Sequence, residues 1–525
     1  MRFPLLDRVR EAAGRRAAPG VRADSVDLRR RNLLAPAGAA AAIAVAFGTR
    51  PTLAQSLAVR AKAAGQDLGS SLVTANGGAA TLTQRFSHSV NAVDDKGCDP
   101  TGATDSTASM QVAFTAAAGG AVVIPPGNYL INATILQPSN TAVLGTGFGT
   151  RWFTTVGNGN GFNFINNAGF NAAYGGTLAQ NLRVCGIFFD YGALTDGGTH
   201  AVSFRLAQNC IVEHCWFNGG NNGTAMLATR NTMVRDCVAT NNGNVAYDHW
   251  DGIENATVED CVASLAPGSS TGVMFTAAST SGGARTTRRC TARNVAVYGG
   301  GLPVMVNVLS AGSFNYDCLI EGIFASGCNG GIVITGPGGR HRVRDINLEN
   351  CGSSAAGDCV VRIGGEPGAA PPNDCEIDAV TANGHTTQGA DVGLVQLGGL
   401  RHKVGSLTLS GSAVPGGVVF WVPTAASGTL IAGPVTADAA TISGVTYGLF
   451  SGSTASSNDT NAALDTFDPW LGAIRHQGST HNFSGSVSFA TPPKLGAYTP
   501  GAPGAPTGTL TVLDSTGTAR RIPVL

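Results

Sequence analysis

Lysine and charge are scarce in this chain. Of its 525 residues only 13% are charged, about half the share of an average soluble protein, and only four are lysines. The 33 basic and 33 acidic residues give a net charge of zero. That balance leaves no global positive charge of the kind expected of a protein that binds nucleic acid or an anionic membrane. The chain also lacks the runs of Lys, Glu and Leu that a helix-rich enzyme needs.

The residues that are abundant favour short strands and turns. The chain contains 73 Gly and 24 Pro, which interrupt regular structure, and its body is rich in Asn, Thr and Val. Hydrophobic residues make up 43% and aromatic residues 6%, which is enough for a large core and argues against wholesale disorder. We therefore expect an all-β fold dense in turns.

The first 54 residues differ from the rest and indicate an export signal. An Arg-rich segment ends in Arg29-Arg30-Arg31-Asn32-Leu33-Leu34, an apolar run follows, and Thr52-Leu53-Ala54 fits a small-residue cleavage site. The arginine pair resembles a twin-arginine signal, which exports folded bacterial proteins; an Arg-rich disordered leader is the alternative. We predict a signal peptide at 1–54, a linker at 55–84 and a periplasmic or extracellular protein. No segment is apolar over the ~20 residues that a membrane span needs.

An internal repeat occupies residues 181–440. Segments such as Asn209-Cys210-Ile211-Val212-Glu213-His214-Cys215 recur about every 28 residues. The repeated positions hold Val, Ile and Cys, which favour strands, and not the leucines of a leucine-rich repeat. The spacing leaves no room for a helix in each repeat. We predict a single-stranded parallel β-helix, a solenoid in which each coil buries its apolar face against its neighbours. The anchor positions are 187, 215, 237, 261, 290, 323, 346, 380, 407 and 435.

Charged residues alternate in sign from coil to coil beside these anchors. Stacked coils place equivalent residues ~4.8 Å apart, where opposite charges attract. We interpret the column as a solvent-facing ladder that holds the register and not as a substrate site. Its predicted members are Glu213, Arg235, Glu259, Arg288, Glu321, Arg344 and Asp378.

The 12 cysteines fall into two groups. One group shares an inward anchor position, and we interpret it as reduced thiols that pack as small hydrophobic side chains, although an exported chain could pair them. The second group is expected to form disulfides. No CxxC or His-rich spacing indicates zinc. The first group is Cys215, Cys237, Cys261 and Cys290; the second is Cys318 with Cys328, and Cys351, Cys359 and Cys375.

Residues 85–150 carry a family resemblance. A turn at Asp94-Asp95-Lys96-Gly97 precedes a Ser/Thr-led helix pattern, Asp105 to Phe114, then the strand 121–130 with Pro125-Pro126-Gly127, and a second strand beginning near Asn140. This order resembles the entry of the pectate lyase superfamily, which includes rhamnogalacturonase-like, epimerase-like and phage tailspike domains. The resemblance implies a right-handed parallel β-helix over residues 85–445, capped by the N-terminal helix, and contact with a polysaccharide. It carries no catalytic residues.

The densest polar and aromatic cluster is Tyr247-Asp248-His249-Trp250-Asp251-Gly252. Extended backbone would place His249 and Asp251 on one face and Asp248 and Trp250 on the other. Acid–base chemistry on a glycan needs such carboxylates and histidines, and a Trp ring offers a platform for a sugar. We predict Asp248, His249 and Asp251 as catalytic residues, with Tyr247 and Trp250 binding substrate. The alternative is a polar corner with Asp-Gly as its turn.

Neighbouring coils offer further binding candidates. Asp190 and His214 supply polar side chains, and Arg289 could pair with a uronate carboxylate. The Asp-Asp and Gly-His-Gly pattern of polygalacturonase-like hydrolases is absent from the repeats. No cofactor is expected: Asp248 and Asp251 could bind Ca²⁺, but no cluster of acidic ligands requires one. Other residues in reach are Tyr191, Asn221, Asn222, Arg230, Arg285 and Tyr298.

The C-terminal tail, residues 446–525, ends in a predicted hairpin at 508–525 with an Asp-Ser-Thr-Gly turn. Two isolated strands are marginal alone, so we expect them to pack on the solenoid or on partner copies. The segment resembles tail-fibre termini and so favours a homotrimer. Two functions remain open: an exported polysaccharide lyase or glycoside hydrolase acting on an acidic polysaccharide, or a non-catalytic glycan-binding adhesin or tailspike-like protein.

Overall fold

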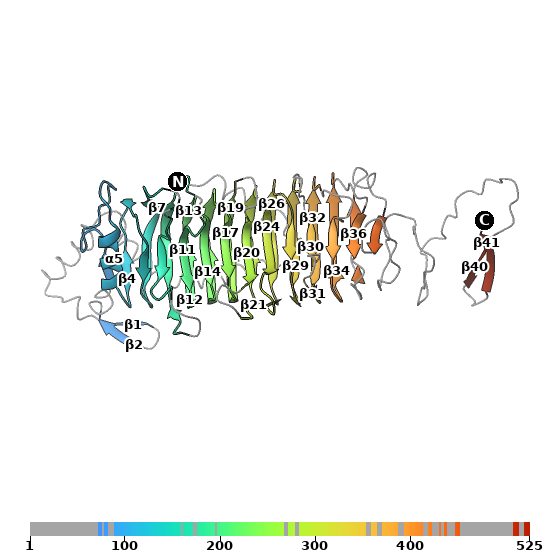
Figure 1. Cartoon of the computed structure of the whole chain (residues 1–525), viewed down its shortest axis with the longest axis horizontal. Helices are drawn as coiled ribbons and strands as arrows, with labels where there is room; N and C mark the ends of the chain where they lie inside the picture. Colours follow the sequence, from blue (N-terminus) through green and yellow to red (C-terminus); the bar gives the residue numbers. More distant parts are fainter. Residues whose placement is uncertain are drawn as a thin grey trace. The chain divides into compact units, whose positions relative to one another are not determined.

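The computed structural model describes most of residues 89–412 and several separate strands (Figure 1). The chain divides into two units, 1–477 and 478–525, which are considered separately. The described residues are 72–75, 78–81, 89–157, 159, 161–171, 176–194, 197–266, 271–278, 283–352, 359–364, 370–386, 393–412, 418–422, 430–431, 435–437, 447–451, 508–513 and 519–524.

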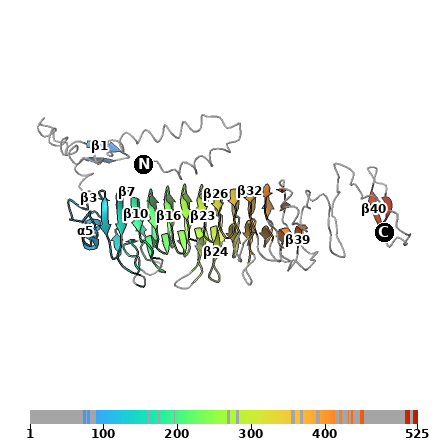
Figure 2. The ribbon, with the colours of Figure 1, turned by 90° about the horizontal axis from the view of Figure 1, so that it is seen from above.

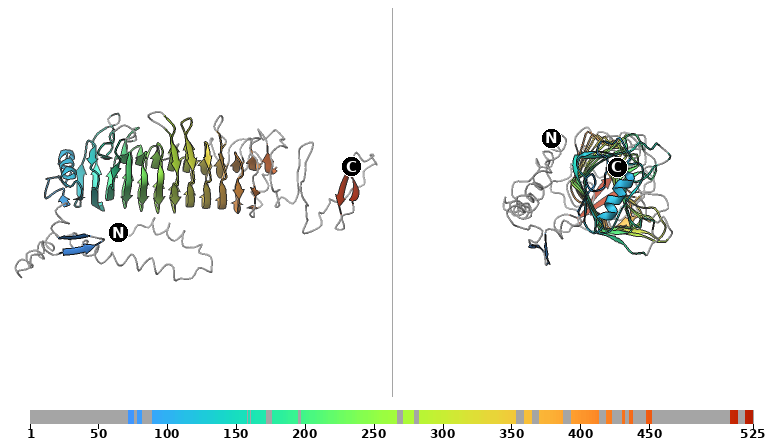
Figure 3. Two further views of the ribbon diagram at one scale, coloured as in Figure 1. Left: turned by 90° about the horizontal axis from the view of Figure 1, so that it is seen from below. Right: turned by 90° about the vertical axis from the view of Figure 1, so that its left-hand side faces the viewer.

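The first unit is a right-handed parallel β-helix, as predicted. Each coil runs through three strand positions, which we name walls A, B and C, and each strand pairs in parallel with its counterpart one coil later. Figures 2 and 3 show the stacked coils from both sides. One coil illustrates the plan: β12 (Ala207–Glu213) lies in wall A, β13 (Trp216–Asn218) in wall B and β14 (Asn222–Leu227) in wall C.

Wall C is a parallel sheet of twelve strands within the described residues. In order along the axis they are β6 (Ile135–Gln137), β8 (Ile165–Asn167), β11 (His200–Arg205), β14, β17 (Val245–Trp250), β20 (Thr271–Ala277), β24 (Leu302–Val308), β27 (Ile332–Ile334), β30 (Val361–Ile363), β33 (Val395–Leu397), β36 (Val418–Val422) and β39 (Tyr447–Ser451).

Walls A and B belong to one continuous sheet because several strands bend from one wall into the other. The strands that form both walls are β7 (Ala142–Phe153), β10 (Arg183–Asp190), β26 (Leu319–Ser326), β29 (Arg342–Glu349) and β32 (Glu376–Asn383). Wall A also contains β3 (Ser89–Asn91), β4 (Ala121–Val123), β9 (Ala179–Gln180), β12, β15 (Arg230–Arg235), β18 (Glu254–Glu259), β21 (Thr286–Arg288), β22 (Thr291–Arg293), β25 (Phe314–Tyr316), β28 (Gly338–Gly339), β31 (Pro372–Asn373), β34 (Lys403–Val404) and β37 (Leu430–Ile431). Wall B also contains β5 (Gly127–Leu130), β13, β16 (Val238–Thr240), β19 (Val262–Ser264), β23 (Ala296–Tyr298), β35 (Leu407–Ser410) and β38 (Val435–Ala437).

The bends between walls repeat a left-handed backbone conformation, and this explains the Asn and Asp content of the repeats. Asn and Asp tolerate this conformation better than other non-glycine residues, because their short side chains can bond to nearby backbone. At the bend within wall A the stacked residues have φ between 50° and 60°. They are Asn140, Asn181, Asn209, Asn231, Asn255, Arg289, Asp317, Arg340, Asp374 and Arg401.

The N-terminal end is closed by the helix α5 (Thr107–Ala116), which packs against β3, β4 and β6. Its buried side chains are Met110, Ala113 and Phe114, and the Phe114 ring lies 6.2 Å from that of Trp152 in the first coils. The first coil would otherwise expose apolar surface and a strand edge. The capping helix predicted for the entry segment is confirmed.

The predicted charge ladder is confirmed with two corrections: Glu213, predicted to face solvent, is 1% exposed, and one member is a different residue. Glu213, Arg235 and Glu259 stand in register on adjacent coils of wall A. The next member is Arg293, which is in register with Glu259 on one neighbouring coil and with Glu321 on the other. Arg288 belongs to a different column, opposite Glu254. In this coil Arg288 ends β21, before the bend at Arg289. The ladder position lies after that bend, on β22, where Arg293 occupies it.

The cysteine predictions also need correction. All 12 cysteines are free, and every one except Cys185 is buried, so the disulfides predicted for the group from Cys318 to Cys375 are wrong. Cys215, Cys237 and Cys261 do form an inward column. Cys290 instead follows the bend residue Arg289, in a column with Cys210, Cys318 and Cys375.

Some predictions lie outside the described residues, including the signal peptide at 1–54. Part of the predicted linker forms a hairpin of β1 (Leu72–Ala75) and β2 (Gly78–Thr81). In the second unit β40 (Gly508–Leu513) and β41 (Ala519–Val524) form the predicted antiparallel hairpin. Within the described part of the chain, no helix has the length and hydropathy needed to cross a membrane.

Candidate functional site

The predicted cluster lies on β17, in the middle of wall C. Along this strand Tyr247 and His249 alternate with Asp248 and Trp250, so the two pairs face opposite sides of the sheet. The inner side is identified by the neighbouring strands, since His249 is in register with Met226 and Phe275, which are both core residues. Asp248 therefore points to the outer face of wall C.

Asp248 is a buried carboxyl group on this outer face. Its exposed fraction is 3%, and Asn222 Nδ2 donates a hydrogen bond of 2.9 Å to its Oδ2. Its Oδ1 accepts no hydrogen bond from the described residues. Burial raises the pKa of Asp248 from 3.8 to about 7, although the Asn222 bond acts in the opposite direction. Asp248 thus resembles a proton donor tuned to neutral pH.

The outer face around Asp248 contains a second polar group without a partner. Ser203, Ala225 and Asp248 occupy one column on three successive strands. Ser203 is wholly buried, and its Oγ has no hydrogen-bond partner among the described residues. Buried polar groups are normally satisfied, and the small Ala225 side chain separates these two. The column therefore holds two buried polar atoms, Ser203 Oγ and Asp248 Oδ1, that have no partner in the described structure.

His249 and Tyr247 occupy the core, which corrects their predicted roles. His249 is 0% exposed, neither ring nitrogen has a partner in the described structure, and its ring lies 5.3 Å from that of Phe275. Burial lowers the pKa of His249 from 6.5 to about 3. The Tyr247 hydroxyl bonds the carbonyl oxygens of Cys237 and Val262 inside the coil. Neither side chain can contact a glycan in this conformation.

Trp250 and Asp251 flank the end of β17. Trp250 is half-buried on the same outer face as Asp248. Asp251 follows the strand in the left-handed region, with φ of 73°, and is wholly buried. Its Oδ1 lies 3.4 Å from Arg285 Nε. Asp251 therefore belongs to the bend that leaves wall C and does not share a strand face with His249 as predicted.

The other predicted binding residues lie on different sides of the coil. Asp190, in wall B, receives hydrogen bonds from Arg151 and Asn218. His214 lies at the bend between walls A and B, with its Nδ1 3.9 Å from Asp236 Oδ2. Arg289, at the bend within wall A, pairs with Glu254. Of the candidates from neighbouring coils, Asn222 is hydrogen-bonded to Asp248, whereas these three lie elsewhere on the coil.

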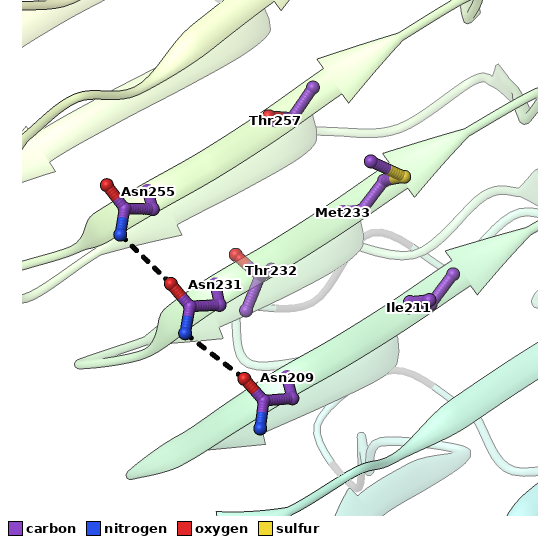
Figure 4. Close-up of a pocket in the computed structure, with 7 residues that line it drawn as sticks. All are labelled: Asn209, Ile211, Asn231, Thr232, Met233, Asn255 and Thr257. Atoms are coloured by element: carbon purple, nitrogen blue, oxygen red, sulfur yellow. Dashed lines mark hydrogen bonds between the residues drawn. The ribbon is translucent and has the colours of Figure 1, made fainter. Parts of the chain in front are cut away.

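A shallow depression lies on wall A (Figure 4). Ile211, Met233 and Thr257 form its floor, and Asn209, Asn231 and Asn255 form one edge, with Thr232 also lining it. Each Asn donates a hydrogen bond from Nδ2 to the Oδ1 of the preceding Asn, at 2.9 Å and 3.1 Å within the depression. This ladder uses amide groups to join coils, so we interpret the depression as structural.

Sequence reasoning missed an aromatic cluster on wall B. The Phe148 ring lies 4.2 Å from that of Trp216 and 5.5 Å from that of Phe188. Phe148 is 46% exposed. We name Phe148, Phe188 and Trp216 the wall B platform. The local signal was the Gly145-Thr146-Gly147-Phe148-Gly149 segment, which interrupts a strand pattern.

Within the described residues no three His, Cys, Asp or Glu side chains come close enough to hold a metal ion. Asp248 and Asp251, considered together for Ca²⁺, point to different environments: one faces outward from β17 and the other is held at the bend near Arg285.

Comparison with known proteins agrees with this architecture. Residues 89–209 match the family model described as rhamnogalacturonase A/epimerase, pectate lyase-like. A search of curated protein sequences gave no significant match. The tailspike protein of E. coli bacteriophage HK620, solved in complex with a pentasaccharide, aligns with a TM-score of 0.50 and 14% identity, over 74% of this chain and 82% of the tailspike.

Two further similar structures are enzymes. The catalytic unit of a GH87 α-1,3-glucanase from Streptomyces thermodiastaticus aligns with a TM-score of 0.44 and 16% identity, covering 71% of this chain and 70% of that chain. The A-module of an Azotobacter vinelandii mannuronan C-5 epimerase aligns with a TM-score of 0.43 and 16% identity, covering 69% and 98%. The chain is thus a β-helix protein of the pectate lyase-like fold, and the resemblance of its entry segment is confirmed.

Proposed function

We propose that the chain is an exported protein that acts on an acidic polysaccharide, with Asp248 as the group that transfers a proton. The observation that carries the proposal is the outward-facing, buried carboxyl of Asp248, whose pKa burial raises to about 7. The match of residues 89–209 to a rhamnogalacturonase and epimerase family model supports polysaccharide as the substrate class. The pentasaccharide complex of the similarly folded tailspike supports it further.

The chemistry assigned to Asp248 follows from its surroundings. Asn222 fixes one carboxyl oxygen, and the other has no partner in the described structure. At neutral pH and below, the protonated form can donate to a departing glycosidic oxygen, and the ionised form can take a proton from carbon next to a uronate carboxylate. Hydrolysis produces reducing ends without unsaturation, and elimination produces an unsaturated uronate. The two reactions therefore differ in a direct absorbance measurement.

The test is turnover of a panel of acidic and neutral polysaccharides by purified protein. Asp248→Asn keeps the shape and the Asn222 contact but cannot transfer a proton, so we expect at least a hundredfold loss, the usual size of a general acid–base contribution. Asp236→Asn, at the bend between walls A and B with its side chain 35% exposed, is the matched control and should keep full activity. His249→Phe should also keep activity, because His249 lies in the core. Unchanged turnover by Asp248→Asn would remove the assignment.

A second candidate is glycan binding without turnover, as in an adhesin or a tailspike-like structural protein. The observation in its favour is that Asp248 is only 3% exposed, whereas the wall B platform offers exposed aromatic surface. Binding of a panel member with no reducing ends and no unsaturated product would favour this candidate. A homotrimer formed through β40 and β41 is part of the proposal, and light scattering of the full chain tests it.

A further inference from the structure

We propose that the wall B platform is a sugar-binding subsite, separate from Asp248, in which one pyranose ring of the polysaccharide stacks on the exposed Phe148 ring, which stands at 73° to the Trp216 ring beside it. The inference rests on the proposed function for its ligand class and extends it to a surface on a different wall of the coil. Exposed, edge-packed aromatic rings beside fixed polar groups are suited to a sugar, since a pyranose has one apolar face and a rim of hydroxyls.

The backbone places Phe148 over the platform through a bulge. In the pairing of β7 with β10, Ile187 stands opposite Gly147, but Phe188 stands opposite Arg151. Residues 148–150 are therefore extra on β7, and Gly147 enters the bulge with φ of 75°. Bulges re-aim side chains next to functional sites. Here the bulge turns an apolar ring toward solvent, which costs free energy unless a ligand covers it.

A row of fixed polar side chains borders the platform. Arg151 is held against Asp190, with distances of 3.0 Å and 2.6 Å from Nε and Nη2 to Oδ2. Asn218 donates to Asp190 Oδ1 at 2.8 Å. Thr240 donates to Asn218 Oδ1 at 3.0 Å, and Trp216 Nε1 donates to Thr240 at 3.1 Å. These bonds fix the orientation of the row before a ligand arrives.

The charge of the row indicates which sugars the platform can accept. The Arg151 guanidinium lies 5.0 Å from the centre of the Phe153 ring and 6.0 Å from that of Phe188, and its side chain is 39% exposed. An exposed guanidinium pre-oriented by a carboxylate can also bond a sugar hydroxyl or a uronate carboxylate. A platform of three rings is smaller than the ~800 Å² per partner that a stable protein interface buries, so a single sugar unit is the better fit.

The test measures binding of polysaccharide in an Asp248→Asn background, where no turnover interferes. Phe148→Ala should weaken binding by about tenfold, the effect of removing one well-packed contact residue. Phe148→Tyr should restore it, because the ring is retained. Phe314→Ala is the matched control: Phe314 is 38% exposed and stacked on Tyr316, at the start of β25 in wall A. Polysaccharide should also shift the tryptophan emission, and Trp216→Phe should remove most of that shift.

The outcomes separate this inference from the proposed function. If Asp248 supports turnover but Phe148→Ala binds as tightly as Phe314→Ala, the subsite is wrong and the proposed function stands. If the parent binds without turnover and Phe148→Ala weakens binding, the subsite stands and the catalytic assignment fails. If the parent neither binds nor turns over any panel member, both are overturned. With Asp248 intact, Phe148→Ala should raise KM for long chains and leave kcat unchanged.

Discussion

Walls A and C each bury one carboxyl group on their outer face, in opposite electrostatic settings. Glu213 in wall A is 1% exposed, and Asp248 in wall C is 3% exposed. Burial raises the pKa of both, but hydrogen bonds from Arg235 and Arg183 outweigh it at Glu213, whose pKa falls below its usual value. Asp248 has only the neutral Asn222 as a partner, and its pKa rises to about 7.

The difference distinguishes a structural carboxylate from a candidate reactive one. Arg183 Nε lies 2.6 Å from Glu213 Oε1, and Arg235 Nε lies 2.8 Å from Oε2, so both oxygens join coils together. At Asp248 one oxygen is left without a partner in the described structure. A buried group whose interactions are incomplete destabilises the fold and persists where function requires it.

The largest expected effect is on the pH dependence of stability. Below about pH 4 Asp248 is protonated in both the folded and the unfolded chain, so it has no effect. Between about pH 4 and 7 only the unfolded chain loses the proton, and the free energy of unfolding falls by about 1.4 kcal/mol per pH unit. Above pH 7 the loss levels off near 4 kcal/mol. Asp248→Asn should remove this loss, so the variant should be more stable than the parent above pH 7.

Urea unfolding of parent and Asp248→Asn from pH 4 to 8.5 measures this difference. Asp236→Asn again serves as the control for the effect of an Asp-to-Asn change itself. A parent protein whose stability relative to Asp248→Asn is constant across this range would show that the Asp248 carboxyl is not held neutral. The carboxyl groups of Asp248 and Glu213 would then not differ in protonation state at neutral pH.

A smaller effect of opposite sign is expected at Glu213. Glu213→Gln removes the charge that holds Arg183 and Arg235, and should cost about 2 kcal/mol at pH 7. The arginine side chains are 40% or more exposed and regain water, so the cost stays below that of a fully buried pair. The folded pKa of Glu213 is depressed, so its contribution is present above the unfolded pKa and disappears as the pH falls through the folded value. The difference in unfolding free energy between the parent and Glu213→Gln should therefore shrink in acid. The difference between the parent and Asp248→Asn vanishes in the same pH range.

The regular part of the fold could be predicted because stacked coils repeat the same environment. The column of Glu213, Arg235 and Glu259 follows from their spacing alone. Arg288 was misassigned because both bends are followed by an inward cysteine: Cys215 after one bend and Cys290 after the other. A repeat of residue types cannot distinguish two bends with the same local chemistry.

The site was harder to predict because it depends on wall C. The sequence places His249 and Asp248 on opposite faces, which is confirmed. Which face is inward depends on the alignment of β17 with Met226 and Phe275, and loops of variable length hide that register. The exposure of Phe148 depends on a bulge that is visible only in the strand pairing.

The smallest expected effect concerns the thiols inside the coils. Cys215, Cys237 and Cys261 pack in one column, and burial raises the pKa of Cys237 well above its usual value, with its neighbours adding to the rise. Thiols in this state are unreactive and act as small apolar side chains.

Excess reductant should leave Tm unchanged, because no disulfide constrains the unfolded chain. A thiol reagent should label fewer than two cysteines per native chain and all 12 in denaturant, whereas a drop in Tm on reduction would mean that some thiols are paired between coils. Walls A and B would then owe part of their register to covalent bonds instead of to ladders and packing.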